Sequence, residues 1–325
     1  MAGVSSTPYA IRYTLEFMIK VGVIGVGHLG KEHVRIYSAL HGCELAGVFD
    51  INPDVKEKFA RKYKVCAFNS IDEMALGVDA VSVVVPTSAH YQVAGAFLEA
   101  GRHVFVEKPI TETTSQAEEL VRLAHESKLI LQVGHVERFN PVMSYLEKQV
   151  ADPRFIEAHR LSPYPNRGTD VSVVLDLMIH DLDVVLHLVR APLVSVDAVG
   201  VPVLSLTEDI ANARLKFANG CVANLTASRI SPEKTRKIRV FSSTHYLSLD
   251  YQNQEGLIYW KENQAIHREK VPIEKDEPLK LELAAFVHAV EHRLEPRVSG
   301  QAGKQALDVA IQICEEIRKN DFVRV

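Results

Sequence analysis

Short apolar runs alternate with longer amphipathic segments from Ile19 to about His135. The short runs are rich in β-branched residues, as is typical of strands buried on both faces of a sheet, and they cover residues 21–24, 45–49, 80–85, 103–106 and 129–133. The segments between them predict helices at about 28–40, 53–63, 88–100 and 114–126. This alternation predicts an α/β domain built on a doubly wound parallel sheet.

The rhythm changes after Pro141, where strands follow one another directly and apolar residues alternate with polar ones. This pattern predicts a mostly antiparallel sheet with one open face. Ala211–Ser228 is its clearest hairpin, in which Asn219 and Gly220 are expected to supply the two positive-φ positions of a tight turn. Helices are expected at about 176–190, 279–293 and 302–319. We therefore divide the chain into an extension (1–17), a first domain (18–137) and an α+β domain for substrate binding and oligomerisation (138–325).

Composition narrows the classes of function. The 325 residues include 37 Lys and Arg against 41 Asp and Glu, a net charge of −4, so no general positive field is available for nucleic acid. No apolar run reaches the ~20 residues that a membrane span requires. Cys43, Cys66, Cys221 and Cys314 lie too far apart for a zinc motif or a disulfide framework. We expect a cytoplasmic protein with reduced thiols.

A glycine-rich segment follows the first predicted strand and opens the first helix. Its sequence, Gly25-Val-Gly-His-Leu-Gly30, has the spacing of a dinucleotide-binding Rossmann loop. Asp50 ends the second strand, 20 residues after Gly30. A carboxylate at that position accepts hydrogen bonds from the adenosine ribose and repels a 2′-phosphate. The cofactor predicted from these residues is NAD rather than NADP.

Candidate catalytic groups come from both halves of the chain. Glu107 and Lys108 close a strand at its carboxyl end, where open α/β sheets present residues to ligands. Asp176, His180 and Asp183 have i, i+4, i+7 spacing, so a helix is expected to place them on one face. They are also a possible set of three metal ligands. We predict no metal, because hydride transfer to a nicotinamide needs none when Lys108 serves as the electrophile.

Several motifs together resemble the Gfo/Idh/MocA family of NAD(P)-dependent oxidoreductases. They are Glu107-Lys-Pro109, Pro86-Thr87, the segment 134–141 and the segment 175–183. The resemblance implies that His180 removes a hydroxyl proton, that Asp176 orients this base or relays the proton, and that Lys108 stabilises the oxygen. The residues expected to contact the cofactor are Gly25, Gly27, His28, Leu29, Gly30, Asp50, Ile51, Pro86, Thr87, His90, Glu107 and Lys108.

Basic and amide side chains near the expected cleft indicate an anionic substrate. The expected substrate-binding residues are Arg138, Asn140, Arg160, Arg167 and Arg229. A basic segment over residues 229–239 suits a diphosphate, although a solvated strand edge explains it equally well. Residues 170–183 and 224–231 most resemble the nucleotide-sugar branch of the family. That resemblance implies oxidation of carbon 3 of UDP-N-acetylglucosamine, a step toward lipid A.

Two alternatives remain open from the sequence. One is a dehydrogenase of a free sugar or a polyol such as inositol, which needs no cations for a diphosphate. The other is a nicotinamide-binding regulator without catalysis, which the presence of both Lys108 and His180 disfavours. The resemblance also implies a homodimer or homotetramer that assembles through the open face of the second sheet.

Overall fold

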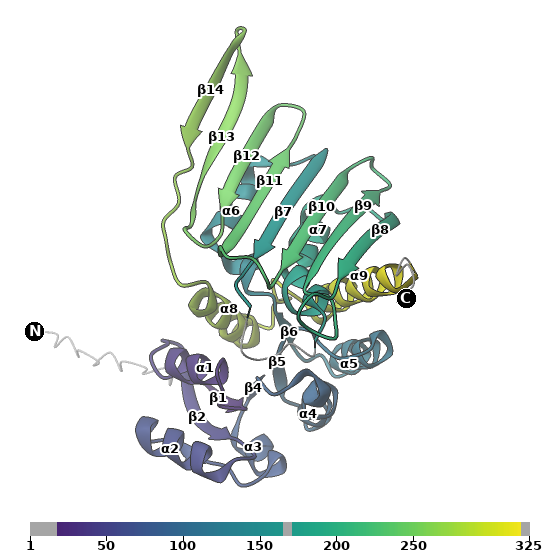
Figure 1. Ribbon diagram of the computed structural model, residues 1–325. Coiled ribbons are helices and arrows are strands. Elements are labelled where there is room, and N and C mark those ends of the chain that lie inside the picture. Colours follow the sequence, from purple (N-terminus) through teal and green to yellow (C-terminus); the bar gives the residue numbers. More distant parts are fainter. Residues whose placement is uncertain (1–17, 165–170, 320–325) are drawn as a thin grey trace, which may run out of the picture.

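Two β-sheets organise the computed structural model, which describes residues 18–164 and 171–319 (Figure 1). The first is an all-parallel sheet in the order β3-β2-β1-β4-β5-β6. Its strands are β1 (Ile19–Ile24), β2 (Cys43–Phe49), β3 (Cys66–Ala67), β4 (Ala80–Val83), β5 (His103–Glu107) and β6 (Leu131–Gly134). This order is that of a Rossmann fold, and it confirms the predicted doubly wound sheet.

The helices that connect these strands confirm the predicted alternation. They are α1 (Gly30–Tyr37), α2 (Pro53–Tyr63), α4 (Thr87–Glu99) and α5 (Thr114–Glu126), together with α3 (Ile71–Gly77), which was not among the expected helices. Helix α1 is shorter than expected, because residues 25–29 form the loop that precedes it. Strand β3 has only two residues and was not among the predicted strands.

The second sheet has eight strands in the order β14-β13-β12-β11-β7-β10-β9-β8. They are β7 (Phe155–Leu161), β8 (Leu193–Val201), β9 (Ile210–Phe217), β10 (Val222–Ser228), β11 (Thr235–Phe241), β12 (His245–Asp250), β13 (Glu255–Glu262) and β14 (Ala265–Lys270). Only the β7–β10 pair is parallel among these strands, so the predicted mostly antiparallel sheet is confirmed.

The turn between β9 and β10 differs from the prediction. Gly220 has a φ of +83°, but Asn219 does not have a positive φ. The Gly220 N–H donates to the Phe217 carbonyl at 2.9 Å, and the Asn219 side chain accepts from the Cys221 N–H at 3.1 Å. The loop spans residues 218–221 and is longer than a two-residue turn, so it needs a single left-handed residue.

Helices cover one face of the second sheet and leave the other open. Helices α6 (Pro141–Gln149), α7 (Ile179–Val189) and α9 (Gly300–Lys319) pack on the covered face (Figure 1). Strand β9 shows the asymmetry, since its residues alternate strictly between buried and solvent-facing positions. The predicted open face is therefore present.

Helix α8 (Pro278–His292) returns to the first sheet, beside α1 (Figure 1). Its residues Leu283 and Phe286 are fully buried in the same core as Val21 and Val34. The chain expected to form the second domain thus also completes the first. This crossing brings the start of α8 beside the carboxyl edge of the parallel sheet.

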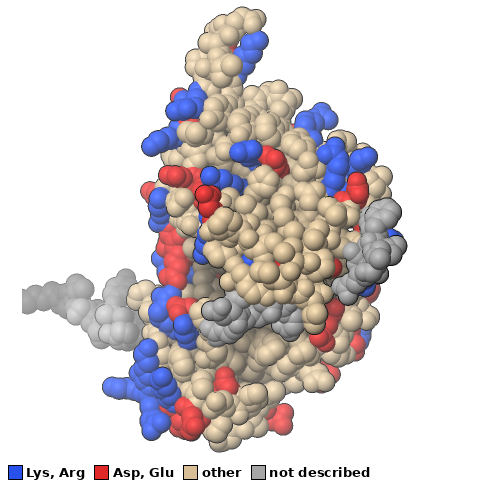
Figure 2. Space-filling view, viewed as in Figure 1, with Lys and Arg blue, Asp and Glu red and all other residues tan. Residues whose placement is uncertain are grey.

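None of the helices in the described part of the chain is long and apolar enough to cross a membrane. On the face shown in Figure 2, basic and acidic side chains are interspersed. That face carries no extended field of a single sign.

Candidate active site

A cavity of about 450 Å³ lies where the carboxyl edge of the first sheet meets the second domain. Two of the three predicted catalytic side chains, Lys108 and His180, line it, and the third, Asp176, does not. Its lining residues are Leu29, Glu107, Lys108, Gly134, Val136, Glu137, Asn140, Arg160, His180, Arg236, Tyr251, Gln252, Gln254, Glu277, Pro278 and Leu279. The tertiary structure thus brings together groups that are separated by up to 250 positions in the chain.

The glycine-rich loop has the geometry of a dinucleotide site. Gly25 has a φ of +81°, and a Cβ there would lie 2.4 Å from the Val84 carbonyl oxygen. A Cβ on Gly30 would lie 1.8 Å from the Gly25 carbonyl oxygen, so the third glycine allows the loop to close onto α1. A Cβ on Gly27 would meet no atom within 4 Å, which leaves its backbone approachable by a ligand. These residues fit a pyrophosphate at the start of α1.

Asp50 lies at the end of β2 next to this loop. Its carboxylate accepts hydrogen bonds from the Val26 N–H at 2.9 Å and from the Asn52 N–H at 2.8 Å. These contacts fix the carboxylate and leave further lone pairs for ribose hydroxyls. Ile51, also predicted to contact the cofactor, is 93% exposed beside it.

Asp176 holds the amino group of Lys108. The Nζ atom donates to the Asp176 backbone carbonyl at 2.6 Å and to its Oδ1 at 3.0 Å. The Lys108 side chain is 17% exposed and reaches the cavity wall from the end of β5. This geometry supports a positioning role for Asp176 that acts through the lysine.

His180 is half-buried and lies in a positively charged environment. Burial lowers its pKa well below the usual range, and the nearby Lys108 and Arg160 lower it further. No described residue hydrogen-bonds its Nδ1. The ring of His135 packs edge-on against it with centroids 6.2 Å apart, and burial lowers the pKa of His135 to about 3. Both imidazoles are therefore neutral near pH 7, as a proton acceptor must be.

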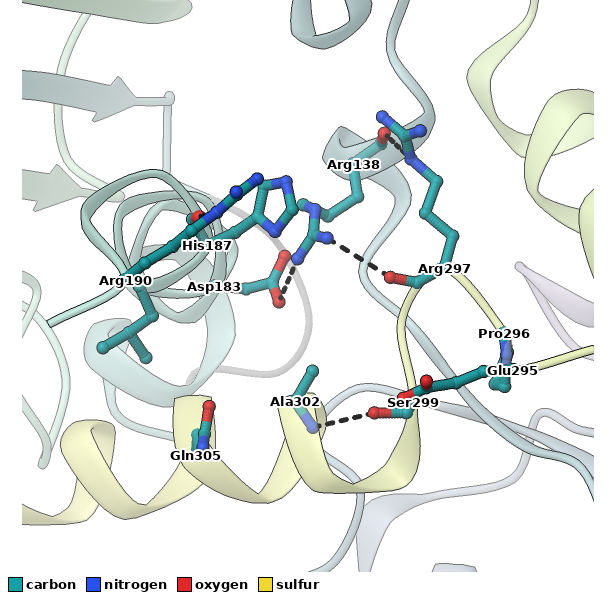
Figure 3. A pocket seen from close by; sticks show the side chains of 11 residues that line it. Arg138, Asp183, His187, Arg190, Glu295, Pro296, Arg297, Ser299, Ala302 and Gln305 are labelled. Carbon is teal, nitrogen blue, oxygen red and sulfur yellow. Dashed lines mark hydrogen bonds and ion pairs between the residues drawn. The ribbon is translucent and has the colours of Figure 1, made fainter. Parts of the chain in front are cut away.

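The prediction that Asp176, His180 and Asp183 share one helix face is wrong. Residues 174–178 form a π-helical turn, which shifts the periodicity before α7 begins. His180 faces the cavity, whereas Asp183 accepts a hydrogen bond from Arg138 at 3.3 Å in a separate pocket behind α7 (Figure 3). Their ligand atoms do not form a metal-binding group among the described residues.

Two of the predicted substrate-binding arginines lie away from the cavity lining. Arg138 is 4% exposed and pairs with Asp183, whose pKa burial raises to about 6. Arg229 is 1% exposed, and its Nε donates to Asp209 at 2.9 Å. Both guanidiniums are buried and paired with protein carboxylates, and neither lines this cavity, so the expectation that they face a diphosphate there is wrong. Arg167 lies outside the described residues.

Arg160 and Asn140 do line the cavity, but protein groups already engage them. Arg160 donates to both carboxylate oxygens of Asp181 at 2.9 Å and to Glu137 at 2.9 Å. The Asn140 amide donates to Glu137 at 3.2 Å and to the Tyr251 carbonyl at 3.0 Å. This buried network forms a rigid part of the cavity wall.

His90 is occupied by the backbone. Its Nδ1 lies 2.8 Å from the Pro109 carbonyl and its Nε2 lies 2.9 Å from the Val85 carbonyl. Because both ring nitrogens already face protein oxygens, neither is free to hydrogen-bond a cofactor, and contact between His90 and the cofactor stays a prediction. Its place next to Pro109 makes it a support for the Lys108 segment.

Three further residues were expected to contact the cofactor. Pro86 and Thr87 lie at the start of α4, and His28 is exposed in the glycine-rich loop.

Arg236 is a cavity residue that was not singled out from its basic segment. Arg236 has the same parity along β11 as Ile238 and Val240, which are buried beneath the helices. Its side chain therefore points to the helix-covered side of the sheet. Its Nη1 lies 3.6 Å from Glu137 Oε1, an oxygen that Arg160 already contacts at 2.9 Å. Strand parity was the signal that separates Arg236 from its neighbour Lys237. Gln252, Gln254 and Glu277 gave no such signal.

Comparison with known proteins agrees with this geometry. Residues 19–135 match the family described as "Oxidoreductase family, NAD-binding Rossmann fold", and residues 147–248 match the "GFO/IDH/MocA C-terminal domain". The chain belongs to the Gfo/Idh/MocA family. It is therefore an oxidoreductase with a nicotinamide dinucleotide-binding domain.

Individual members of the Gfo/Idh/MocA family give a finer comparison. The chain is 39% identical to UDP-N-acetylglucosamine 3-dehydrogenase of Acidithiobacillus ferrooxidans over 91% of this chain and 96% of that protein. The crystal structure of that enzyme superimposes on this chain with a TM-score of 0.89, and the aligned part covers 93% of this chain and 98% of the enzyme's chain. An inositol 2-dehydrogenase of Rhizobium meliloti is 29% identical over 55% of this chain and 58% of its own length.

Proposed function

We propose that this protein uses NAD to oxidise the carbon 3 hydroxyl of UDP-N-acetylglucosamine to a ketone. The observation that carries the proposal is the convergence of Lys108 and His180 on one cavity beside a dinucleotide loop. The choice of substrate is supported by 39% identity along almost the whole chain to an enzyme named for that reaction. The choice of NAD is supported by the carboxylate of Asp50 next to the loop.

The catalytic roles follow from the chemistry of an alcohol. When bound, the nicotinamide ring supplies the hydride acceptor. The carbon loses hydride only as its hydroxyl loses a proton, and the neutral imidazole of His180 accepts that proton. The Lys108 ammonium stabilises the negative charge that develops on the oxygen, while Asp176 holds the ammonium in place.

Arg236 is the cation that we assign to the diphosphate. Its side chain is 39% exposed, and its nearest carboxylate oxygen, Glu137 Oε1 at 3.6 Å, is already engaged by Arg160 at 2.9 Å. We expect Arg236→Ala to raise KM for the UDP-sugar by about 10- to 150-fold, the equivalent of losing a charge-assisted hydrogen bond of about 1.5–3 kcal/mol. Initial rates at varied substrate concentration measure the effect, and kcat should change much less.

Lys237→Ala is the matched control for Arg236→Ala. It removes a cation from the next residue, which is exposed on the open face of the sheet. We expect its KM to equal that of the native enzyme. Equal KM values for the two variants would show that the diphosphate lies elsewhere.

The function itself is tested with the purified protein, NAD or NADP, and a panel of UDP-N-acetylglucosamine, UDP-glucose and myo-inositol. Reduction of NAD in the presence of UDP-N-acetylglucosamine, with a 3-keto sugar identified by mass spectrometry after reduction with borodeuteride, is the expected result. Turnover of inositol alone would establish the polyol alternative. Cofactor binding without turnover of any substrate would support a regulator instead.

We further propose that copies of the chain assemble through the open face of the second sheet into a dimer or tetramer. Aromatic rings extend across that face, with centroids 4.4 Å apart for Phe241 and Tyr246 and 5.0 Å apart for Tyr246 and Tyr259.

We also propose that the enzyme works in the cytoplasm, where its cysteines stay reduced. We assign its keto product to an aminotransferase step of lipid A synthesis.

A further inference from the structure

The last turn of α8 carries three metal-binding side chains close together. His288, Glu291 and His292 each offer one ligand atom, and these atoms all lie within 4.8 Å of one another. Glu291 Oε2 is 3.6 Å from His292 Nε2, and the two imidazole rings have centroids 4.3 Å apart. The i, i+3, i+4 spacing places all three on one side of the helix.

Packing holds this helix firmly while leaving the three side chains in solvent. Phe286, Ala289 and Val290 on the opposite side of α8 are buried in the core of the first sheet. His288, Glu291 and His292 are exposed. The ligand atoms therefore project from a fixed backbone, and side-chain rotation alone is needed to bring them around one ion.

The donor set determines the class of ion. Two imidazoles with one carboxylate suit zinc and neighbouring divalent transition metals, whereas magnesium and calcium prefer oxygen donors alone. A cation also interacts favourably with the carboxyl end of a helix, where the last carbonyls point outward. We propose that His288, Glu291 and His292 bind one zinc ion per chain, with water completing the coordination.

The proposed zinc site is separate from the candidate active site. Leu279 at the start of α8 lines the cavity, and His288 follows nine residues later, a rise of about 14 Å along the helix. The ion would link side chains across the final turn, immediately before the left-handed Arg293 ends the helix. Such a clamp stabilises the folded chain, because a ligand that binds the native state raises its stability. It takes no part in hydride transfer.

The test uses the full-length protein after treatment with a chelator and dialysis. Isothermal titration with zinc chloride is expected to give one ion per chain, and thermal unfolding is expected to shift to higher temperature when zinc is present. His288→Ala and His292→Ala should each weaken zinc binding by at least about tenfold, because losing even a hydrogen-bond partner of a metal ligand costs that much. All three positions are exposed, so the variants should fold normally.

His267→Ala is the matched control for the zinc site. His267 is half-buried against Trp260, and its Nε2 lies 4.0 Å from Glu262 Oε2, but this pair belongs to no three-residue group among the described residues. Zinc affinity, thermal shift and kinetic constants of this variant should equal those of the native protein. The proposal is overturned if the native protein binds no zinc, or if the α8 variants bind it as tightly as His267→Ala. Unchanged affinity in Glu291→Gln would remove Glu291 from the ligand set.

Discussion

Lys108→Ala is expected to lower kcat by about 10²- to 10³-fold, the usual cost of removing one group that stabilises a developing oxyanion. The ammonium is fixed by two hydrogen bonds to Asp176 at the wall of the cavity, so its removal takes a prepositioned cation away from the reacting oxygen. Affinity for NAD should change little, since the glycine-rich loop is untouched. Stopped or continuous assays of NADH formation measure kcat, and titration calorimetry measures NAD binding.

Lys148→Ala is a suitable control, because Lys148 is exposed near the end of α6 and does not line the cavity. Its kinetic constants should match those of the native enzyme. If Lys108→Ala retained near-native turnover, the assignment of Lys108 as the electrophile would be wrong. If it lost NAD binding as well, the variant would report on cofactor affinity rather than on chemistry.

Gly30→Ala is expected to destabilise the protein by about 1–3 kcal/mol, the typical cost of forcing an extra methyl group into a closely packed site. The new Cβ would lie 1.8 Å from the Gly25 carbonyl oxygen, and that atom belongs to the backbone and cannot rotate away. The loop must open, so NAD binding should also be lost. Urea unfolding monitored by circular dichroism measures the free energy of unfolding.

Gly27→Ala separates the two roles of glycine in the same loop. A Cβ at Gly27 meets no protein atom within 4 Å, so the free energy of unfolding should stay within about 0.5 kcal/mol of the native value. Its methyl group would instead meet a bound pyrophosphate, which should weaken NAD binding in a folded protein. Equal stability of the two variants would contradict the packing role assigned to Gly30.

Much of the candidate site was predictable where function depends on local sequence. The Gly25–Gly30 spacing predicted a loop between a strand and a helix, and Lys108 was expected at the end of a strand. The grouping of Asp176, His180 and Asp183 failed, because a π-helical turn changes which residues share a face. Helical periodicity predicts a face only when the hydrogen-bonding pattern is constant.

The arginines show the same limit of prediction from local sequence. Arg229 and Arg236 belong to one basic segment, yet Arg229 is buried against Asp209 and Arg236 lines the cavity. Charge in a sequence does not distinguish a cation that binds a ligand from one that pairs within the protein. Strand parity made Arg236 distinguishable. Asp209 and Arg229 lie opposite each other where β9 begins and β10 ends, so their pairing depends on the register of the β9–β10 hairpin, which the sequence analysis did not extend beyond residues 211–228.

The amino-acid sequence by itself determined the fold class, the alternation of strands and helices in the first domain, the dinucleotide loop and the side chains expected to perform the chemistry. These features depend on the period of apolar residues and on short motifs, both of which are local properties of the chain. Only the tertiary structure decided which charged groups face the cavity, how Asp176 holds Lys108, and that α8 completes the first domain. Those outcomes depend on contacts between residues far apart in the chain, where burial requires each charge to find a partner.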